Sequence, residues 1–294
     1  MKTLHILLCS AAVTLSAAAT TTINPTHQYA WAGNFGWTVW HDAGADGAVI
    51  GQYICSGYVW SPNCGWIHLG DGTPDNGIRY SNESGADYGV NVQEPCSSGG
   101  VSKAKLRGFA YAANIGWINF ENQGNPEVSL QTGRLSGYAW SANCGWINLD
   151  DANWFVATDV IQPGVDSDHD GIPDAFELSV TDPPRLDVLT ATGDYDHDGK
   201  TDVEEYLADT NPLNPHSNLS VTDFVVSGNT FTLTWASSPA RFYRITSSTS
   251  LLPASWETVL DNIVPDGPST SRSVTVAAAA KRFFRIGVFL PLGP

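Results

Sequence analysis

Carboxylates recur at fixed spacing in two short segments of this 294-residue chain. The first segment reads D-S-D-H-D-G-I-P-D-A-F-E from Asp166, and the second reads D-Y-D-H-D-G-K-T-D-V-E-E from Asp194. Both have acids at positions 1, 3, 5, 9 and 12 and a glycine at position 6. Like charges this close repel one another unless a cation neutralises them. Alternating oxygen ligands, a glycine turn and a closing glutamate are the pattern of a calcium-binding loop.

The pattern assigns an equivalent ligand set to each loop. Aspartates supply side-chain oxygens, with position 9 acting directly or through water, position 7 supplies a backbone carbonyl, and a glutamate closes the site. The predicted ligands of the first loop are Asp166, Asp168, Asp170, the Ile172 carbonyl, Asp174 and Glu177. Those of the second loop are Asp194, Asp196, Asp198, the Lys200 carbonyl, Asp202 and Glu205. Ca²⁺ fits better than Mg²⁺, which demands a tighter octahedron, and a solvated acidic run is the alternative interpretation.

The segments around the loops do not form complete EF-hands. Pro163 and Gly164 break the chain before the first loop, and a turn at residues 191–193 precedes the second. Helices are expected only after the loops, over residues 173–180 and 201–209. The wording D-Y-D-H-D-G-K-T-D-V-E-E-Y-L-A-D-T-N-P-L-N-P resembles bacterial thrombospondin type 3 repeats. That resemblance covers residues 166–215 and implies extracellular calcium-binding spacers between domains.

Residues 29–151 contain four copies of an aromatic repeat, each with Asn and Gly two residues apart. Each copy predicts a tight β-hairpin, because Asn and Gly tolerate positive φ at a turn. The residue between Asn and Gly is expected to point inward, and it is Phe35, Cys64, Ile115 or Cys144. The copies read Y-A-W-A-G-N-F-G-W-T-V-W from Tyr29, Y-V-W-S-P-N-C-G-W-I-H-L from Tyr58, F-A-Y-A-A-N-I-G-W-I-N-F from Phe109 and Y-A-W-S-A-N-C-G-W-I-N-L from Tyr138. This motif resembles Y-A-W-x-x-N-x-G-W-I-N repeats of secreted bacterial proteins, and the resemblance implies no catalytic role.

Two roles are open for the repeat aromatics. They can build the core, because each aromatic side chain buries a large area. Alternatively, some of them form an exposed surface that stacks on sugars, and Trp40 and Tyr53, which lie outside the repeat register, are the first candidates for it. The sequence does not decide between burial and display.

The first 19 residues have one Lys, an apolar run and a small-residue exit, which predicts a secretory signal peptide. A lipid anchor at Cys9 is the minor alternative. Export favours two disulfides among the remaining cysteines, with three possible pairings, one of which joins Cys64 to Cys144. That pairing requires copies 2 and 4 of the repeat to be neighbours. The four candidate cysteines are Cys55, Cys64, Cys96 and Cys144, and a zinc site is disfavoured because no two are closely spaced.

The predicted fold is mainly β. It comprises an aromatic β-hairpin and meander repeat domain over 20–158, a calcium-loop connector with short helices over 159–215, and a small β-sandwich over 216–294. The last domain resembles the short C-terminal sandwich domains of some secreted bacterial proteins. Its Arg244 and Arg285 are expected either to lie on the surface or to pair with the acidic connector.

The net charge of −16 disfavours a nucleic-acid partner, and no later apolar run is long enough to span a membrane. The chain has no G-x-S-x-G, H-E-x-x-H or P-loop motif, so a non-enzymatic protein is expected. The predicted function is that of a secreted or cell-surface protein in which calcium stiffens a connector and holds the repeat domain at a distance from the sandwich. The alternative is a carbohydrate-binding protein whose repeat aromatics stack on polysaccharide, and a cell-surface component is a further possible partner.

Overall fold

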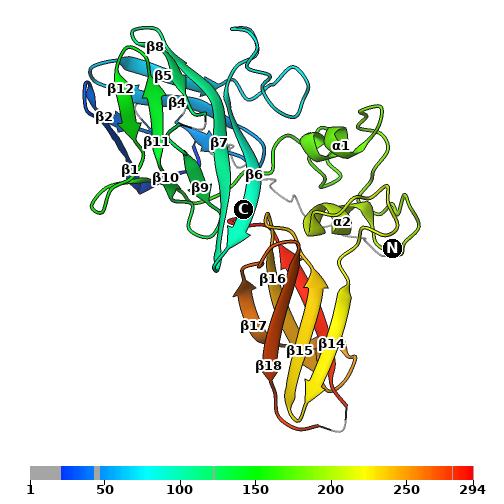
Figure 1. Ribbon diagram of the computed structural model, residues 1–294. Helices are drawn as coiled ribbons and strands as arrows, with labels where there is room; N and C mark the ends of the chain where they lie inside the picture. The colour runs from blue at the N-terminus through cyan, green and yellow to red at the C-terminus, as the bar shows by residue number, and fades with distance from the viewer. Residues whose placement is uncertain (1–20, 43–46, 122, 280, 294) are drawn as a thin grey trace, which may run out of the picture.

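The computed structural model describes residues 21–42, 47–121, 123–279 and 281–293, and it is mainly β, as predicted. Figure 1 shows the repeat domain at the upper left, two short helices beside it, and the C-terminal sandwich below both. The predicted signal peptide, residues 1–19 with Cys9, lies outside the described residues.

Each copy of the aromatic repeat is an antiparallel hairpin, as expected, and the hairpins follow one another around a closed sheet. Pairing between copies joins β2 to β4, β5 to β7, β8 to β11, and β12 back to β1. The four hairpins are β1 (Ile23–Ala32) with β2 (Gly36–Val39), β4 (Cys55–Ser61) with β5 (Gly65–Gly70), β7 (Val101–Ala112) with β8 (Gly116–Asn119), and β11 (Tyr138–Ser141) with β12 (Gly145–Asn148). We call this closed sheet the repeat ring.

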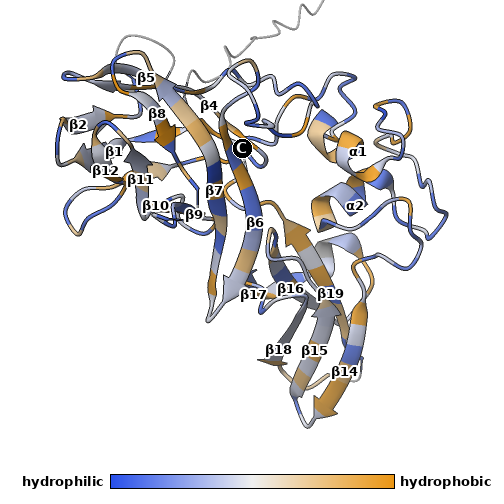
Figure 2. Ribbon diagram, turned by 45° about the horizontal axis from the view of Figure 1, so that its top comes forward, coloured by the Kyte–Doolittle hydropathy of each residue, from blue (hydrophilic) through white to orange (hydrophobic). Residues whose placement is uncertain are grey.

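Short strands extend the repeat ring at its edges. Strands β6 (Val90–Ser98) and β9 (Glu127–Ser129) pair with the long β7, and β10 (Leu135–Ser136) pairs with β9. Strand β3 (Val49–Ile50) pairs with β4, and β13 (Val156–Thr158) pairs with β1. Hydrophobic and hydrophilic residues interleave along β6 and β7, as strands with two different faces require (Figure 2).

The small residues of the repeat face the inside of the ring, and its aromatic residues face out. A closed sheet of eight strands has an interior just wide enough for side chains, so alanine and serine fit near the hairpin turns. The inward residues of the first strands are at most 2 % exposed and comprise Ala30, Ala32, Val59, Ser61, Ala110, Ala112, Ala139 and Ser141. Isoleucines such as Ile118 fill the interior between them. The interpretation of the repeat aromatics as the core is therefore wrong for most of them.

The turn asparagines link the four copies in a circuit. Each Asn side chain donates a hydrogen bond to the backbone carbonyl of the inward residue in the preceding copy, and copy 1 donates to copy 4. The bonds run from Asn63 to Phe35 at 2.8 Å, Asn114 to Cys64 at 3.1 Å, Asn143 to Ile115 at 3.0 Å, and Asn34 to Cys144 at 2.9 Å. The glycine after each inward residue has a φ of 72–87°, which other residues rarely adopt. The repeated Asn-x-Gly therefore closes the ring as well as turning the chain.

The four cysteines among the described residues are free thiols, so the predicted disulfides are not formed between them in the structure. Cys55 is buried and Cys96 is exposed, which argues against joining them without a movement of the chain. Copies 2 and 4 lie across the ring from each other and are not neighbours, contrary to the condition set for a Cys64–Cys144 bond. Phe35, Cys64 and Ile115 are buried, as expected of inward residues, and Cys144 is half-buried.

The C-terminal residues form the predicted sandwich of two three-stranded sheets. Its core includes Leu233, Trp235, Tyr243 and Ile245, all fully buried. One sheet has the order β14 (Val221–Ser227), β15 (Thr230–Ala236), β18 (Ser269–Thr275), and the other has the order β17 (Glu257–Ile263), β16 (Phe242–Ser248), β19 (Phe283–Phe289). A 3-10 turn, η1 (Pro253–Ser255), precedes β17.

The sandwich contacts the repeat domain directly. The Ser102 hydroxyl donates to the Pro239 carbonyl at 2.6 Å. The amide of Ile161, a connector residue packed in the repeat-domain core, donates to the Leu292 carbonyl at 3.0 Å. Phe242 of the sandwich belongs to the hydrophobic core of the repeat domain. The expectation that the connector holds the two β domains at a distance is therefore wrong.

Asn143→Ala tests the asparagine circuit. The change removes the hydrogen bond to the Ile115 carbonyl, and we expect the free energy of unfolding to fall by about 1 kcal/mol. Asn153→Ala is the matched control, because the Asn153 side chain is exposed and bonds only to Asp151 nearby. Denaturant unfolding of both variants, followed by tryptophan fluorescence, measures the difference. Equal stability of the two variants would contradict a role for the circuit.

Candidate calcium sites

The two acidic loops share most of their internal hydrogen bonds. The first aspartate of each loop accepts backbone N–H groups from positions 5 and 6. Asp166 accepts from Asp170 at 3.2 Å and Gly171 at 2.9 Å, whereas Asp194 accepts from Asp198 at 3.1 Å and Gly199 at 3.0 Å. The loops therefore fold alike although their remaining sequences differ.

The other aspartates face the same small volume. Asp166, Asp168 and Asp170 place one carboxylate oxygen each within 4.8 Å of one another, and the triplet beginning at Asp194 does the same. Position 4 has positive φ in both loops, 64° at His169 and 63° at His197. Both histidine rings make their hydrogen bonds to nearby backbone carbonyls and remain exposed, consistent with their expected place outside the ligand set.

A helix follows each loop, close to the predicted bounds, and α1 (Asp174–Val180) and α2 (Asp202–Ala208) each carry the closing glutamate in their first turn. Glu177 is 0 % exposed, and neither of its carboxylate oxygens has a partner among the described residues. Glu205 is 1 % exposed. One of its oxygens accepts from the Thr210 hydroxyl at 3.2 Å, and the other has no partner in the described part of the chain. Burying a carboxylate without a donor or a cation is costly.

The pKa values of both glutamates register this environment. Burial raises the pKa of Glu177 to about 8, and repulsion from Asp168 and Asp170 adds to the rise. Burial also raises the pKa of Glu205 to about 7, with Asp196 contributing next. The neighbouring negative charges disfavour the ionised form of each glutamate. A cation bound between the glutamate and the aspartates would favour that form and lower its pKa.

The position-9 aspartates have protein donors instead. Asp174 accepts from the amide and the hydroxyl of Ser167, at 2.7 and 2.6 Å. Asp202 is 1 % exposed and accepts the amides of Thr190 and Tyr195, at 2.9 and 3.0 Å. Both side chains thus brace the loops, which fits contact with an ion through water better than direct ligation.

The residues between the loops fold against the two helices. Leu189 of this segment is fully buried with Ile172, Phe176 and Tyr206, and the last two rings lie 5.2 Å apart in an edge contact. Ile172, the position-7 residue whose carbonyl is a predicted ligand, has its side chain buried in this cluster. Lys200 holds the same position in the second loop, with an exposed side chain. The two loops are consequently joined by one small hydrophobic core.

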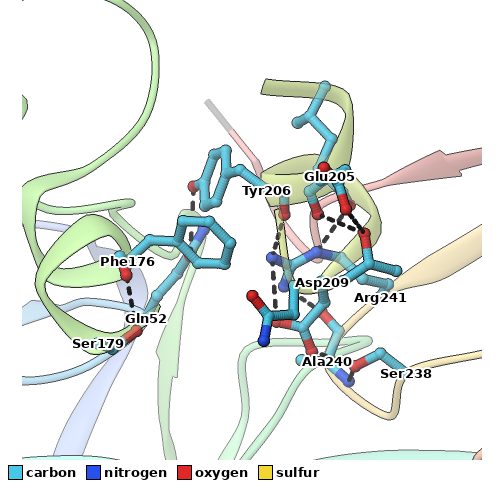
Figure 3. Close-up of polar contacts among 12 residues, drawn as sticks. Gln52, Phe176, Ser179, Glu205, Tyr206, Asp209, Ser238, Ala240 and Arg241 are labelled. Atoms are coloured by element: carbon cyan, nitrogen blue, oxygen red, sulfur yellow. Dashed lines mark hydrogen bonds and ion pairs between the residues drawn. The ribbon is translucent and has the colours of Figure 1, made fainter. Parts of the chain in front are cut away.

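Arg241 of the sandwich binds the end of α2 (Figure 3). Its guanidinium is 4 % exposed and donates to the carbonyls of Leu207 and Tyr206, both at 2.8 Å. It also lies 3.6 Å from the Asp209 carboxylate, which accepts a hydrogen bond from the Ser238 hydroxyl. The Tyr206 carbonyl also accepts the Asp209 amide, so Arg241 adds a second donor there and supplies a donor to the Leu207 carbonyl at the helix end. They connect the sandwich to the same helix that carries Glu205.

Of the two alternatives for Arg244 and Arg285, the structure shows the first: both are exposed on the surface and neither pairs with the connector. Arg244 makes a bidentate ion pair with Asp261 at 2.8 and 2.9 Å, and Arg285 lies over the Trp256 ring at 3.8 Å. Arg241, which the sequence analysis missed, makes the contact instead. The sequence gives little indication of this contact, because the partners of Arg241 are backbone carbonyls, which every residue has.

Further contacts tie the loops to both β domains. The Tyr206 hydroxyl donates to Gln52 of the repeat domain at 3.3 Å (Figure 3). Asn218, just before the sandwich, donates to the second oxygen of Asp198 at 2.9 Å. The connector thus contacts both the repeat domain and the sandwich.

Neither of the two aromatics first suggested for sugar stacking is exposed: Trp40 is buried and Tyr53 is half-buried. Trp40 is 4 % exposed and donates to the Thr38 hydroxyl at 3.1 Å. Tyr53 packs against the connector core beneath Arg79, whose guanidinium lies 5.2 Å from the ring centroid. That part of the prediction is wrong: Trp40 is the last residue of copy 1, and the equivalent Leu69, Phe120 and Leu149 are buried as well. The repeat positions supply the exposed aromatics, namely Tyr29, Trp31, Trp37, Tyr58, Trp66, Tyr111, Trp117, Tyr138 and Trp146.

Comparison with known proteins does not place this chain in a family: no family model, curated protein or solved structure matches it. Neither of the helices described here, each of 7 residues, has the length or apolar character needed to cross a membrane.

In chelator, we expect stability to fall as the pH rises from about 5 to 8. The folded-state pKa values of Glu177 and Glu205 exceed their ordinary value of 4.5, so the folded protein holds protons that the unfolded chain releases. The lowered pKa of His68 acts in the opposite direction, since burial disfavours its charged form. The measurement is therefore the melting temperature of the wild type minus that of the Glu177→Gln, Glu205→Gln double variant. A difference that rises with pH would contradict the expectation.

Arg241→Met tests the contact between the sandwich and α2. We expect a loss of about 2–4 kcal/mol in the free energy of unfolding, because two helix-end carbonyls lose a buried charged donor. Arg244→Met is the control, since its ion pair with Asp261 is exposed and contributes about 1 kcal/mol or less. Urea unfolding measures both losses, and a loss for Arg241→Met no greater than the control would refute the assignment.

Proposed function

We propose that the protein binds two calcium ions, one in each acidic loop, and that the ions fix the junction between its two β domains. The observation that carries this proposal is the buried Glu177 carboxylate, whose oxygens have no protein partner within the described chain and which neighbours three aspartates. The second loop repeats the arrangement with Glu205. We propose a non-enzymatic, exported protein, in keeping with the predicted signal peptide.

The donor set suits calcium. Asp166, Asp168 and Asp170 place carboxylate oxygens close together, so every side-chain donor of this group is an oxygen. Glu177 can complete the set with its two carboxylate oxygens. Hard carboxylate and carbonyl oxygens favour Ca²⁺ over Zn²⁺, which prefers His and Cys ligands. The proposed set for each ion comprises positions 1, 3, 5, 7 and 12, with position 9 reached through water. The likeness of residues 166–215 to thrombospondin type 3 repeats supports the same metal.

The ions would act as constant structural components. Extracellular calcium modules bind with dissociation constants of about 10⁻⁴–10⁻³ M. At ten times that concentration, each ion stabilises the folded state by about 1.4 kcal/mol. Since α2 also contacts Gln52 and Arg241, this stabilisation extends to both flanking domains. The proposed connector therefore clamps the two domains together, in place of the spacer role expected from the resemblance.

Calorimetric titration with calcium tests the proposal. We expect about two ions per chain, and a melting temperature that rises by several degrees between chelator and millimolar calcium. Glu177→Gln and Glu205→Gln should each remove one ion, because a neutral amide is a poor bidentate ligand. Asp187→Asn is the control, since it removes the same charge from an exposed connector residue outside both loops. No bound calcium in the wild type, or equal loss in the control, would refute the proposal.

A further inference from the structure

We propose that the groove between Trp117 and the loop at residues 82–85 binds a neutral polysaccharide of all-equatorial pyranose units. This site is separate from the calcium loops and goes beyond the function proposed for them. It lies on the outer surface of the repeat ring, beside copy 3, where the longest insertion between copies meets the exposed aromatics.

Trp117 is a fixed and accessible platform. Its side chain is 45 % exposed, although three aromatic rings surround it. Tyr88 and Tyr111 contact it edge-on, with centroids at 4.9 and 5.0 Å and interplanar angles of 87° and 63°. Phe109 adds a third edge contact at 6.2 Å. These edge-to-face contacts hold the indole in one orientation, and nearly half of the side chain still remains exposed.

The loop forms the opposite wall of the groove. The cavity has a volume of about 340 Å³ and is lined by Asn82, Glu83, Ser84, Gly85, Tyr88, Phe109 and Trp117. The Asn82 side chain fixes the loop, because its amide oxygen Oδ1 accepts hydrogen bonds from the backbone amides of Gly89 at 3.1 Å and Phe109 at 3.3 Å. A methyl group at Gly85 would lie 4.0 Å from the Trp117 ring, so the loop passes close to the indole. The groove is therefore already formed without a ligand.

The polar atoms at the rim define the ligand. Glu83 has an exposed carboxylate with no hydrogen-bond partner among the residues described, so it is free to accept two hydroxyl protons. The Tyr88 hydroxyl is paired with the His68 ring at 2.8 Å and can accept or donate once more. An apolar platform beside hydroxyl-binding groups fits a sugar, which has C–H bonds on its faces and hydroxyls at its edge.

Shape and charge narrow the sugar class. A pyranose with all substituents equatorial has flat C–H faces, and a flat indole contacts such a face over its whole area. The net charge of −16 and the carboxylate of Glu83 would repel uronic or sulfated chains. We therefore commit to a neutral, glucose-configured, β-linked chain.

The repeat provides an internal control. Trp146 occupies the same position in copy 4 and is 46 % exposed, but its ring contact is Tyr138 at 6.0 Å, and it does not line the groove. Trp117→Ala and Trp146→Ala thus remove the same side chain from equivalent positions. Any general effect of the exposed aromatics appears in both variants, whereas an effect of the groove appears in one.

The experiment is calorimetric titration of the full chain, in millimolar calcium, with cellohexaose and separately with polygalacturonate. We expect cellohexaose to bind, Trp117→Ala to weaken it about ten-fold or more, and Glu83→Gln to weaken it several-fold. Trp146→Ala should bind within about two-fold of the wild type. Circular dichroism and calcium titration confirm that each variant is folded, so failure here leaves the calcium proposal standing. Absence of cellohexaose binding, tighter binding of polygalacturonate, or equal losses in the two tryptophan variants would overturn the proposal.

Discussion

Glu177 has both carboxylate oxygens buried beside three aspartates, and neither oxygen has a hydrogen-bond donor in the described part of the chain. In the unfolded chain water solvates the same group, so folding without a cation is opposed by desolvation and by repulsion. The rest of the connector depends on resolving this conflict. The helices begin at the loops, their hydrophobic cluster lies between the loops, and both domain contacts start from those helices. In the proposed complex, a divalent cation would convert this unfavourable carboxylate into a ligand that anchors the connector.

The junction gives the connector a different role from that of a flexible or extended linker. Helix α2 carries Glu205 in its first turn, contacts Gln52 through Tyr206, and meets Arg241 at its end. A helix held at three points on three parts of the chain cannot shift at one end without disturbing the others. We therefore propose that order in the loops contributes to the placement of the β domains, beside the direct contacts between them. The repeat ring, closed by its own asparagine circuit, supplies a stable body for this arrangement.

The sequence predicts local geometry well and long-range placement poorly. The convergence of each aspartate triplet follows from spacing alone, because these positions are close together within one short loop. The hairpins follow from the Asn-x-Gly turns for the same reason. Alternation of Trp31 with Ala30 shows that the strands have two faces, but the narrow interior of the closed ring decides that alanine faces in. Trp40 was misplaced although the equivalent position of the other copies is apolar. Tyr53 was misplaced, and Arg241 was missed, because their surroundings come from segments distant in the chain.

Diffraction from calcium-grown crystals at a long wavelength tests the central claim most directly. We predict two anomalous peaks, each about 2.3–2.6 Å from a carboxylate oxygen of Glu177 or Glu205 and within the corresponding aspartate triplet. Such peaks would show that the cation occupies the position that the buried glutamates define. The account would be contradicted by the absence of a peak in both loops, with Glu177 protonated and hydrogen-bonded to one of the aspartates.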